Sequence, residues 1–244
     1  MSAPAANPPA ANRPVANRPV AAEDVHCLVV AKAPVPGLAK TRLGASVGAA
    51  AAADLAAAAL LDTLRVCGEV FAPERRFLAL TGDLADAARS SDLEAAVESW
   101  TVLAQRGSDF SARLAAAHAD VQAMRQGPVL QLGMDTPHVH AGLLAEVCTQ
   151  LASCDAVLGP AADGGWWALA MNDPTAAHVL AGIPTSTSQT GRLTLAALRQ
   201  EGLRVSLAAT LVDVDTHDDA VTVAHAAPHT LFAAAWQQAG RWSA

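Results

Sequence analysis

Three aspartates are the residues of this chain best suited to bind a metal ion. Asp135 follows the apolar run Val129–Leu132 and Gly133, and Asp213 and Asp215 lie in a second acidic turn, Asp-Val-Asp-Thr. Carboxylates from two segments, together with water and phosphate oxygens, are typical ligands of Mg²⁺ or Mn²⁺. The sequence therefore predicts a metal site made by Asp135 with Asp213 or Asp215. The alternative is that Asp135 only caps a turn.

A second group of candidate residues is basic. Lys32, Lys40 and Arg42 lie within one short segment of a chain that has only 16 Lys and Arg. Cations beside backbone amides, near Gly37 and a helix N-terminus, form a site for a polyphosphate. The alternative is a solvated loop.

Two common nucleotide-binding loops are excluded at this place. A P-loop requires glycines where this chain has Pro34 and Ala39, which argues against an ordinary P-loop kinase or NTPase. No Gly-x-Gly-x-x-Gly follows the first predicted strand, which argues against a dinucleotide dehydrogenase.

A glycine turn carries the third group of candidates. Asp163 is followed by Gly164 and Gly165, which let a ligand approach the backbone closely, and then by Trp166 and Trp167. The tryptophans are suited to stack on a sugar or a base. The alternative is a turn that joins two core strands with one tryptophan buried.

Two histidines follow Asp135 closely in the sequence. His138 and His140 have no carboxylate partner that the sequence reveals, so we interpret them as helix-entry residues. No Gly-x-Ser-x-Gly elbow occurs, and the order of serines and histidines supports no catalytic triad.

Alternating strands and helices must position these residues. Such alternation predicts an α/β fold with a mostly parallel sheet covered on both faces, whose ligands bind at the carboxyl ends of the strands. A cap at Thr136 or His138 is expected before the third predicted helix, which begins near His140. The predicted strands are Val25–Ala31, Arg76–Leu80, Trp100–Ala104, Val129–Leu132, Ala156–Gly159, Trp166–Met171 and Arg204–Leu207. The predicted helices are Ser46–Cys67, Ser111–Arg125, His140–Leu151, Gln189–Glu201, Asp218–His225 and Pro228–Trp242.

Composition bounds the class of protein. The 244 residues are 52% hydrophobic and 16% charged, which suits one compact α/β domain over 25–244. Residues 1–24, rich in Pro and Ala, are predicted to be a flexible extension. The net charge of −7 argues against nucleic-acid binding, and no apolar run is long enough for a membrane span. The four cysteines lack metal-finger spacing and fit a reduced cytoplasm.

Five motifs together resemble one bacterial family. The sequence is similar to the DUF2064 proteins, also called rSAM/selenodomain-associated transferase 1, of the nucleotide-diphospho-sugar transferase superfamily with a GT-A fold. The resemblance covers about residues 25 to 225. The motifs are AKAPVPGLAKTRL (Ala31 to Leu43), QRGSDFSARLAAA (Gln105 to Ala117), GMDTP (Gly133 to Pro137), VLGPAADGGWWAL (Val157 to Leu169) and LVDVDTHDD (Leu211 to Asp219).

The resemblance implies a role for each motif. The nucleotide-binding set would be Lys32, Pro36, Gly37, Lys40, Arg42, Gln105 and Asp109, of which Gln105 and Asp109 would face the nucleoside. The catalytic set would be Lys40, Arg42 and Asp135, and the metal ligands Asp135, Asp213 and Asp215. Asp163, Gly164, Gly165 and Trp166 would border the acceptor or sugar pocket. This chain departs from the family pattern at Phe110-Ser111, Met134, Thr136 and Trp166-Trp167, which affects the acceptor pocket more than the metal site.

Three functions follow from these expectations. The first is a Mg²⁺-dependent or Mn²⁺-dependent transferase, with nucleotidyl transfer from an NTP to a small phosphorylated acceptor as the preferred reaction. The second is a glycosyltransferase that uses a nucleotide-sugar. The third is a non-catalytic nucleotide-binding protein, because a fold alone does not grant activity. The expected partners are a nucleotide or nucleotide-sugar and a small-molecule acceptor, with neither nucleic acid nor membrane.

Overall fold

The computed structural model describes residues 22–239 of the chain. Most of the predicted flexible extension, residues 1–21, lies outside the described residues. Its last three residues form the short 3-10 turn η1 (Ala22–Asp24).

A mixed sheet is the centre of the fold. Its seven strands lie in the order β3-β2-β1-β4-β6-β5-β7, and only β6 runs antiparallel to its neighbours. The predicted α/β class with a mostly parallel sheet is therefore confirmed. The strands are β1 (His26–Lys32), β2 (Arg76–Thr81), β3 (Thr101–Ala104), β4 (Val129–Leu132), β5 (Ala156–Pro160), β6 (Trp166–Met171) and β7 (Val205–Leu207).

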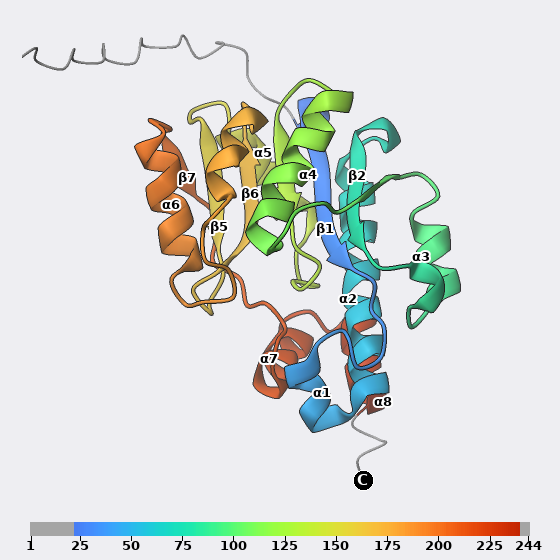
Figure 1. The fold of residues 1–244 in the computed structure, drawn as a ribbon. Helices are drawn as coiled ribbons and strands as arrows, with labels where there is room; N and C mark the ends of the chain where they lie inside the picture. Colours follow the sequence, from blue (N-terminus) through green and yellow to red (C-terminus); the bar gives the residue numbers. More distant parts are fainter. Residues whose placement is uncertain (1–21, 240–244) are drawn as a thin grey trace, which may run out of the picture.

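Helices cover both faces of this sheet (Figure 1). On one face lie α2 (Ala49–Val70), α3 (Ser90–Ala96) and α5 (Ala141–Gln150). The other face carries α4 (Phe110–Met124), the 3-10 helix η4 (Pro174–Leu180) and α6 (Thr190–Gln200). A third group, α1 (Thr41–Val47), α7 (His217–Ala226) and α8 (Leu231–Ala239), lies beyond the carboxyl end of β1.

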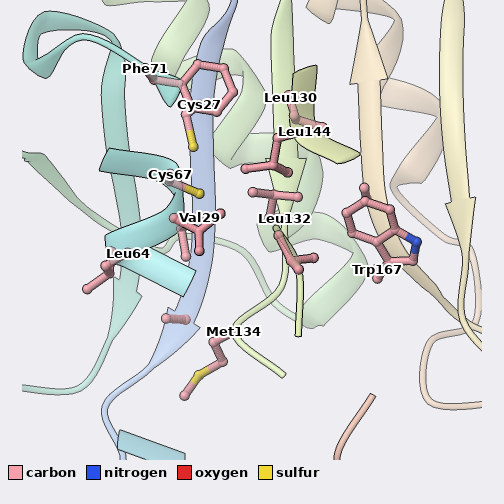
Figure 2. Packing of buried hydrophobic residues seen from close by; sticks show 14 of the residues in the cluster. Cys27, Val29, Leu64, Cys67, Phe71, Leu130, Leu132, Met134, Leu144 and Trp167 are labelled. Carbon is pink, nitrogen blue, oxygen red and sulfur yellow. The ribbon is translucent and has the colours of Figure 1, made fainter. Parts of the chain in front are cut away.

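Alternation along the buried strands explains why both faces are covered. In β1, Cys27 and Val29 face α2, whereas Leu28 and Val30 face α4, and all four are buried. Figure 2 shows Cys27 and Val29 packed beside Cys67 of α2. A strand with two apolar faces gains stability only when helices cover both of them.

Three details differ from the expectations. The predicted helix from Ser46 is two helices, because Gly48 adopts φ 87° between α1 and α2. Helix α3 was not predicted from the sequence. The cap of α5 is His140, whose Nδ1 accepts a hydrogen bond from the Leu143 amide, so the expected cap at Thr136 or His138 was wrong.

The remaining predicted elements occur within a few residues of their expected bounds. Strand β4 has the predicted limits, and the predicted terminal helix is α8, whose last expected residues lie beyond 239 and outside the description. Within 22–239, no helix is both long and apolar enough to cross a membrane.

A buried carboxylate attaches the C-terminal helix α8 to α2. Asp62, 1% exposed, accepts hydrogen bonds from the backbone amides of Leu231 and Phe232. These amides belong to the first turn of α8, where no intrahelical acceptor is available. Asp62 therefore caps α8 from a distant part of the chain.

Replacing this carboxylate should loosen α8. We expect Asp62→Ala to lower the free energy of unfolding by about 2 kcal/mol, because two amides lose their acceptor. Urea unfolding followed by circular dichroism measures the change. Asp92→Ala, on the exposed first turn of α3, is the matched control. Equal effects of the two substitutions would contradict the capping role.

Candidate functional site

Two neighbouring cavities lie at the carboxyl edge of the sheet. The smaller, of about 280 Å³, is lined by the basic segment, including Lys32, Lys40 and Arg42. The larger, of about 370 Å³, is lined by the glycine turn and the acidic turn, including Asp163 and Asp213. Three residues line both cavities: Arg42, Asp135 and Asp215. The cavities therefore meet at one cation and two carboxylates.

Sheet topology explains this convergence. Strands β1 and β4 are parallel neighbours, so the loops that follow them leave at the same edge. Strand β6 runs in the opposite direction, so its first residue, Trp166, pairs with Pro160 at the end of β5 and lies at that edge too. The amide of Val214 donates to the carbonyl oxygen of Asp135 at 2.9 Å, which attaches the acidic turn to the loop after β4.

Lys40 joins the two carboxylates that the cavities share. Its Nζ lies 2.9 Å from Oδ2 of Asp135 and 2.8 Å from Oδ1 of Asp215. The side chain is 10% exposed, whereas those of both aspartates are 37% exposed. Burial alone would lower the pKa of Lys40, but the two carboxylates raise it above its usual value. Lys40 is therefore a charged, fixed bridge at the boundary between the cavities.

The other two cations are less constrained. Arg42 is 71% exposed, and its Nη1 is 3.5 Å from Oδ2 of Asp215. Lys32 is exposed and donates from Nζ to the carbonyl oxygen of Leu38. Both side chains border the smaller cavity and can turn toward an anionic ligand there.

The two aspartates of the acidic turn, Asp213 and Asp215, have pKa values shifted in opposite directions. Burial, together with the negative charges of Asp163 and Asp215, raises the pKa of Asp213 to about 6. Burial would raise the pKa of Asp215 as well, but Lys40 outweighs that effect and lowers it. Within residues 22–239, Asp215 forms ion pairs with Lys40 and Arg42, whereas Asp213 forms none.

This donor set fits a hard divalent cation. Asp135, Asp213 and Asp215 offer carboxylate oxygens, the ligands that Mg²⁺ prefers, along the wall of one cavity. Across residues 22–239, no three His, Cys, Asp or Glu side chains are already grouped closely enough to hold a metal ion. A metal here would therefore be held by one or two carboxylates, with water and phosphate oxygens completing its shell.

The glycine turn is packed against the start of α6. A Cβ added to Gly164 would lie 2.2 Å from the carbonyl oxygen of Ser188, so only glycine fits there. Asp163 accepts from the Gly165 amide at 2.7 Å. Both tryptophans line the larger cavity. Trp167 is buried in the core, and its Nε1 donates to the carbonyl oxygen of Ala209, whereas Trp166 is half-buried.

Several predicted residues do not line either cavity. Pro36 and Gly37 of the basic segment line neither cavity, and Gly164, unlike Gly165, does not line them either. Gln105 donates to the carbonyl oxygens of Ala31 and Ala79. Asp109 caps α4 through the Ala112 amide.

Sequence reasoning missed two groups of lining residues. Gln131, on β4, is fully buried, lines the larger cavity and accepts from His118 of α4, with 2.7 Å between Oε1 and Nε2. A polar residue inside the apolar run Val-Leu-Gln-Leu was the available signal. The second group is a hydroxyl-bearing loop before α6, for which no pattern stood out: Thr185, Ser186, Thr187, Ser188 and Thr190.

Comparison with known proteins identifies the family. A family model described as "Uncharacterized protein conserved in bacteria (DUF2064)" matches residues 63–187, which is half of the chain. The chain belongs to this family. The resemblance found in the sequence motifs is thereby confirmed.

Two solved structures share the fold of this chain. A candidate nucleotide-diphospho-sugar transferase from Desulfovibrio desulfuricans G20 is 23% identical, with a TM-score of 0.77, over 88% of this chain and 95% of that one. The 4-diphosphocytidyl-2C-methyl-D-erythritol synthase from Anaerococcus prevotii DSM 20548 is 10% identical, with a TM-score of 0.51, over 83% and 97%. No curated protein sequence matches this chain.

The buried histidine beside the larger cavity should make stability depend on pH. Desolvation lowers the pKa of His118 from 6.5 to about 4, so the folded protein keeps it neutral while the unfolded chain protonates it. Stability from this residue is therefore present above pH 6.5 and falls as the pH decreases toward 4. Between pH 7 and pH 5, we expect His118 alone to lower the free energy of unfolding by about 2 kcal/mol.

Urea unfolding at both pH values tests this expectation. His118→Gln keeps a donor for Gln131 but cannot titrate. Between pH 7 and pH 5, the free energy of unfolding of this variant should therefore fall by about 2 kcal/mol less than that of the unsubstituted protein. His225→Gln, at an exposed position on α7, gives the background effect of removing one histidine. An equal loss in the protein and in His118→Gln would contradict the prediction.

Proposed function

We propose that this DUF2064 protein is a metal-dependent transferase that moves a nucleotidyl group from an NTP to a small phosphorylated acceptor. The observation that supports it best is that Arg42, Asp135 and Asp215 line both cavities. A cation and two carboxylates at the boundary of two ligand spaces suit a reaction between two bound molecules. The shared fold with nucleotide-diphospho-sugar transferases is consistent with this chemistry but does not select the reaction.

The smaller cavity is the proposed phosphate site. Lys32 and Arg42 border it with charges that can turn toward a ligand, and Lys40 adds a fixed charge. Arginine and lysine bind phosphate oxygens through charge-assisted hydrogen bonds. In this proposal, Lys40 has a second task, because it holds the carboxylates of Asp135 and Asp215 in position.

Asp135 and Asp215, with Asp213 beside them, are the proposed holders of Mg²⁺ or Mn²⁺. When bound, the ion would offset the negative charge that develops on the phosphate oxygens. The protein's part is to fix the carboxylates, which the Lys40 ion pairs and the hydrogen bond from Val214 to Asp135 achieve.

The proposed reaction forms one bond to phosphorus and breaks another. An oxygen of the acceptor phosphate attacks the α-phosphorus of the NTP, and the bond from that phosphorus to its bridging oxygen breaks. Pyrophosphate leaves with both electrons of the broken bond. Arg42 and Lys40 stabilise the charge on the oxygens around phosphorus.

Glycosyl transfer is the second candidate. The larger cavity carries five hydroxyl side chains between Thr185 and Thr190 and the half-buried Trp166, and both features suit a sugar. The same cations and carboxylates would then hold the diphosphate of a nucleotide-sugar, and an NDP would be released instead of pyrophosphate.

Product analysis tests these candidates. Each of the four NTPs, with Mg²⁺ or Mn²⁺ and a mixture of sugar phosphates, is assayed for pyrophosphate, and UDP-glucose and GDP-mannose are assayed for NDP. Pyrophosphate release supports nucleotidyl transfer, and NDP release supports glycosyl transfer. Thermal stabilisation by these ligands with neither product would indicate a non-catalytic nucleotide-binding protein.

Substitution of the shared aspartate tests the site itself. We expect Asp135→Asn to lower kcat/KM by about 100-fold or more, because it removes a charge that faces both the metal and Lys40. The metal-dependent part of the thermal shift with NTP should disappear as well. Asp218→Asn, whose side chain is fully exposed on α7, is the matched control and should keep both signals. Retention of both signals by Asp135→Asn would disprove the metal role.

A further inference from the structure

One wall of the larger cavity contrasts with the rest of it. We call this the uncharged wall, which is formed by residues of β1, β4 and α4: Val30, Phe110, Leu114, Gln131 and Leu132. The charged lining residues come instead from the first turn of α1 and from the loops at the edge of the sheet. Part of any ligand that fills this cavity therefore meets a surface without charge.

Gln131 is the polar group of the uncharged wall. Its Oε1 is 2.7 Å from Nε2 of His118, and because that oxygen is an acceptor, Nε2 of His118 carries the proton and donates. The amide is thereby held in one orientation. Its Nε2 has no hydrogen-bond partner among the described residues, and the side chain is 0% exposed.

An unpaired donor at this position needs an explanation. Buried polar groups in proteins almost always have a partner, and leaving one unpaired costs free energy. Gln131 lies between Leu130 and Leu132, and the apolar Val129 lies on the same face of β4 as Gln131. The packing therefore does not require a polar residue here. The residue also belongs to the wall of a cavity, where a ligand can supply the missing acceptor.

We propose that Gln131 is a specificity-determining residue that donates a hydrogen bond from Nε2 to an uncharged oxygen of the ligand in the larger cavity. His118 is the positioning residue, because its hydrogen bond directs the Gln131 amide. The selected oxygen belongs to a hydroxyl or carbonyl group, since the uncharged wall offers no cation to a phosphate. This inference rests on the proposed function, in that the larger cavity holds a substrate.

The charge distribution supports an uncharged group. Among the described lining residues of the larger cavity, four are aspartates and Arg42 is the one cation. Arg42 lines both cavities and therefore lies at their boundary. A phosphate is therefore better placed at that boundary, and the uncharged part of the same ligand against Gln131.

Nuclear magnetic resonance of the full-length protein tests this contact. The Nε2 resonances of Gln131 are assigned by their loss in Gln131→Met, and the probes are D-glucose, D-mannose, cytidine, uridine, guanosine and inorganic phosphate. We expect a saturable shift with a hexose, which identifies a hydroxyl, or with a nucleoside, which identifies a carbonyl. Gln131→Met should lower the affinity for that probe about tenfold, as measured from the shift of the Trp166 indole resonance. The proposal would be overturned by a shift with phosphate but with no other probe. It would also be overturned if none of the probes caused a shift.

Variants of His118 test the positioning role. His118→Gln keeps a donor for Oε1 of Gln131 and should keep the amide shift, whereas His118→Leu should weaken probe binding and move the free Nε2 resonances. The double variant Gln131→Met/His118→Leu removes both polar groups and remains informative if a single variant does not fold. Equal binding of the probe by this double variant and by the unsubstituted protein would also overturn the proposal.

Failure of this proposal is separable from failure of the proposed function. The probes are tested without metal or nucleotide, and Asp218→Asn, whose side chain is fully exposed on α7, should bind them as the unsubstituted protein does. Loss of NTP turnover with an intact Gln131 response would contradict the transferase proposal only. Normal turnover with no Gln131 response would contradict only the role of Gln131.

Discussion

The ion pairs of Lys40 hold the candidate site together. One buried ammonium group contacts a carboxylate after β4 and a carboxylate before α7, so three distant segments meet at a single Nζ. A buried charge is tolerated only where such partners offset the loss of water. Lys40 also has φ 47°, a left-handed conformation that costs a non-glycine residue free energy. The position is therefore determined by the contacts and not by local preference.

The reversed strand β6 gives the site its second half. In a fully parallel sheet, the residue that begins a strand lies at the edge opposite the ligand. Because β6 is antiparallel to β4 and β5, the turn at Asp163 and the start of β6 at Trp166 reach the same edge as Asp135. The larger cavity is thus a direct consequence of one strand direction.

Much of this arrangement was predictable from the sequence, because it depends on local patterns. Apolar runs gave the strands, with β4 at its predicted limits, and the rule for carboxyl ends gave the meeting of Lys40, Asp135 and Asp215. The details that were missed are of two kinds. The cap by His140 and the helix break at Gly48 are local, but hydrophobic periodicity does not encode them. The double ion pair of Lys40 joins distant segments and is set by tertiary packing.

Gln131 shows where sequence patterns and function separate. A glutamine within a buried strand contradicts the binary pattern of the core, and such local conflicts are expected at functional positions. The smaller cavity is lined by Lys32, Lys40 and Arg42, whereas β1, β4 and α4 present an uncharged surface to the larger one. In the proposed function, a ligand that spans both cavities would therefore carry its negative charge at one end and uncharged polar oxygens at the other. Charge would select the orientation of such a ligand, and the amide of Gln131 would then distinguish between ligands that share the same phosphate.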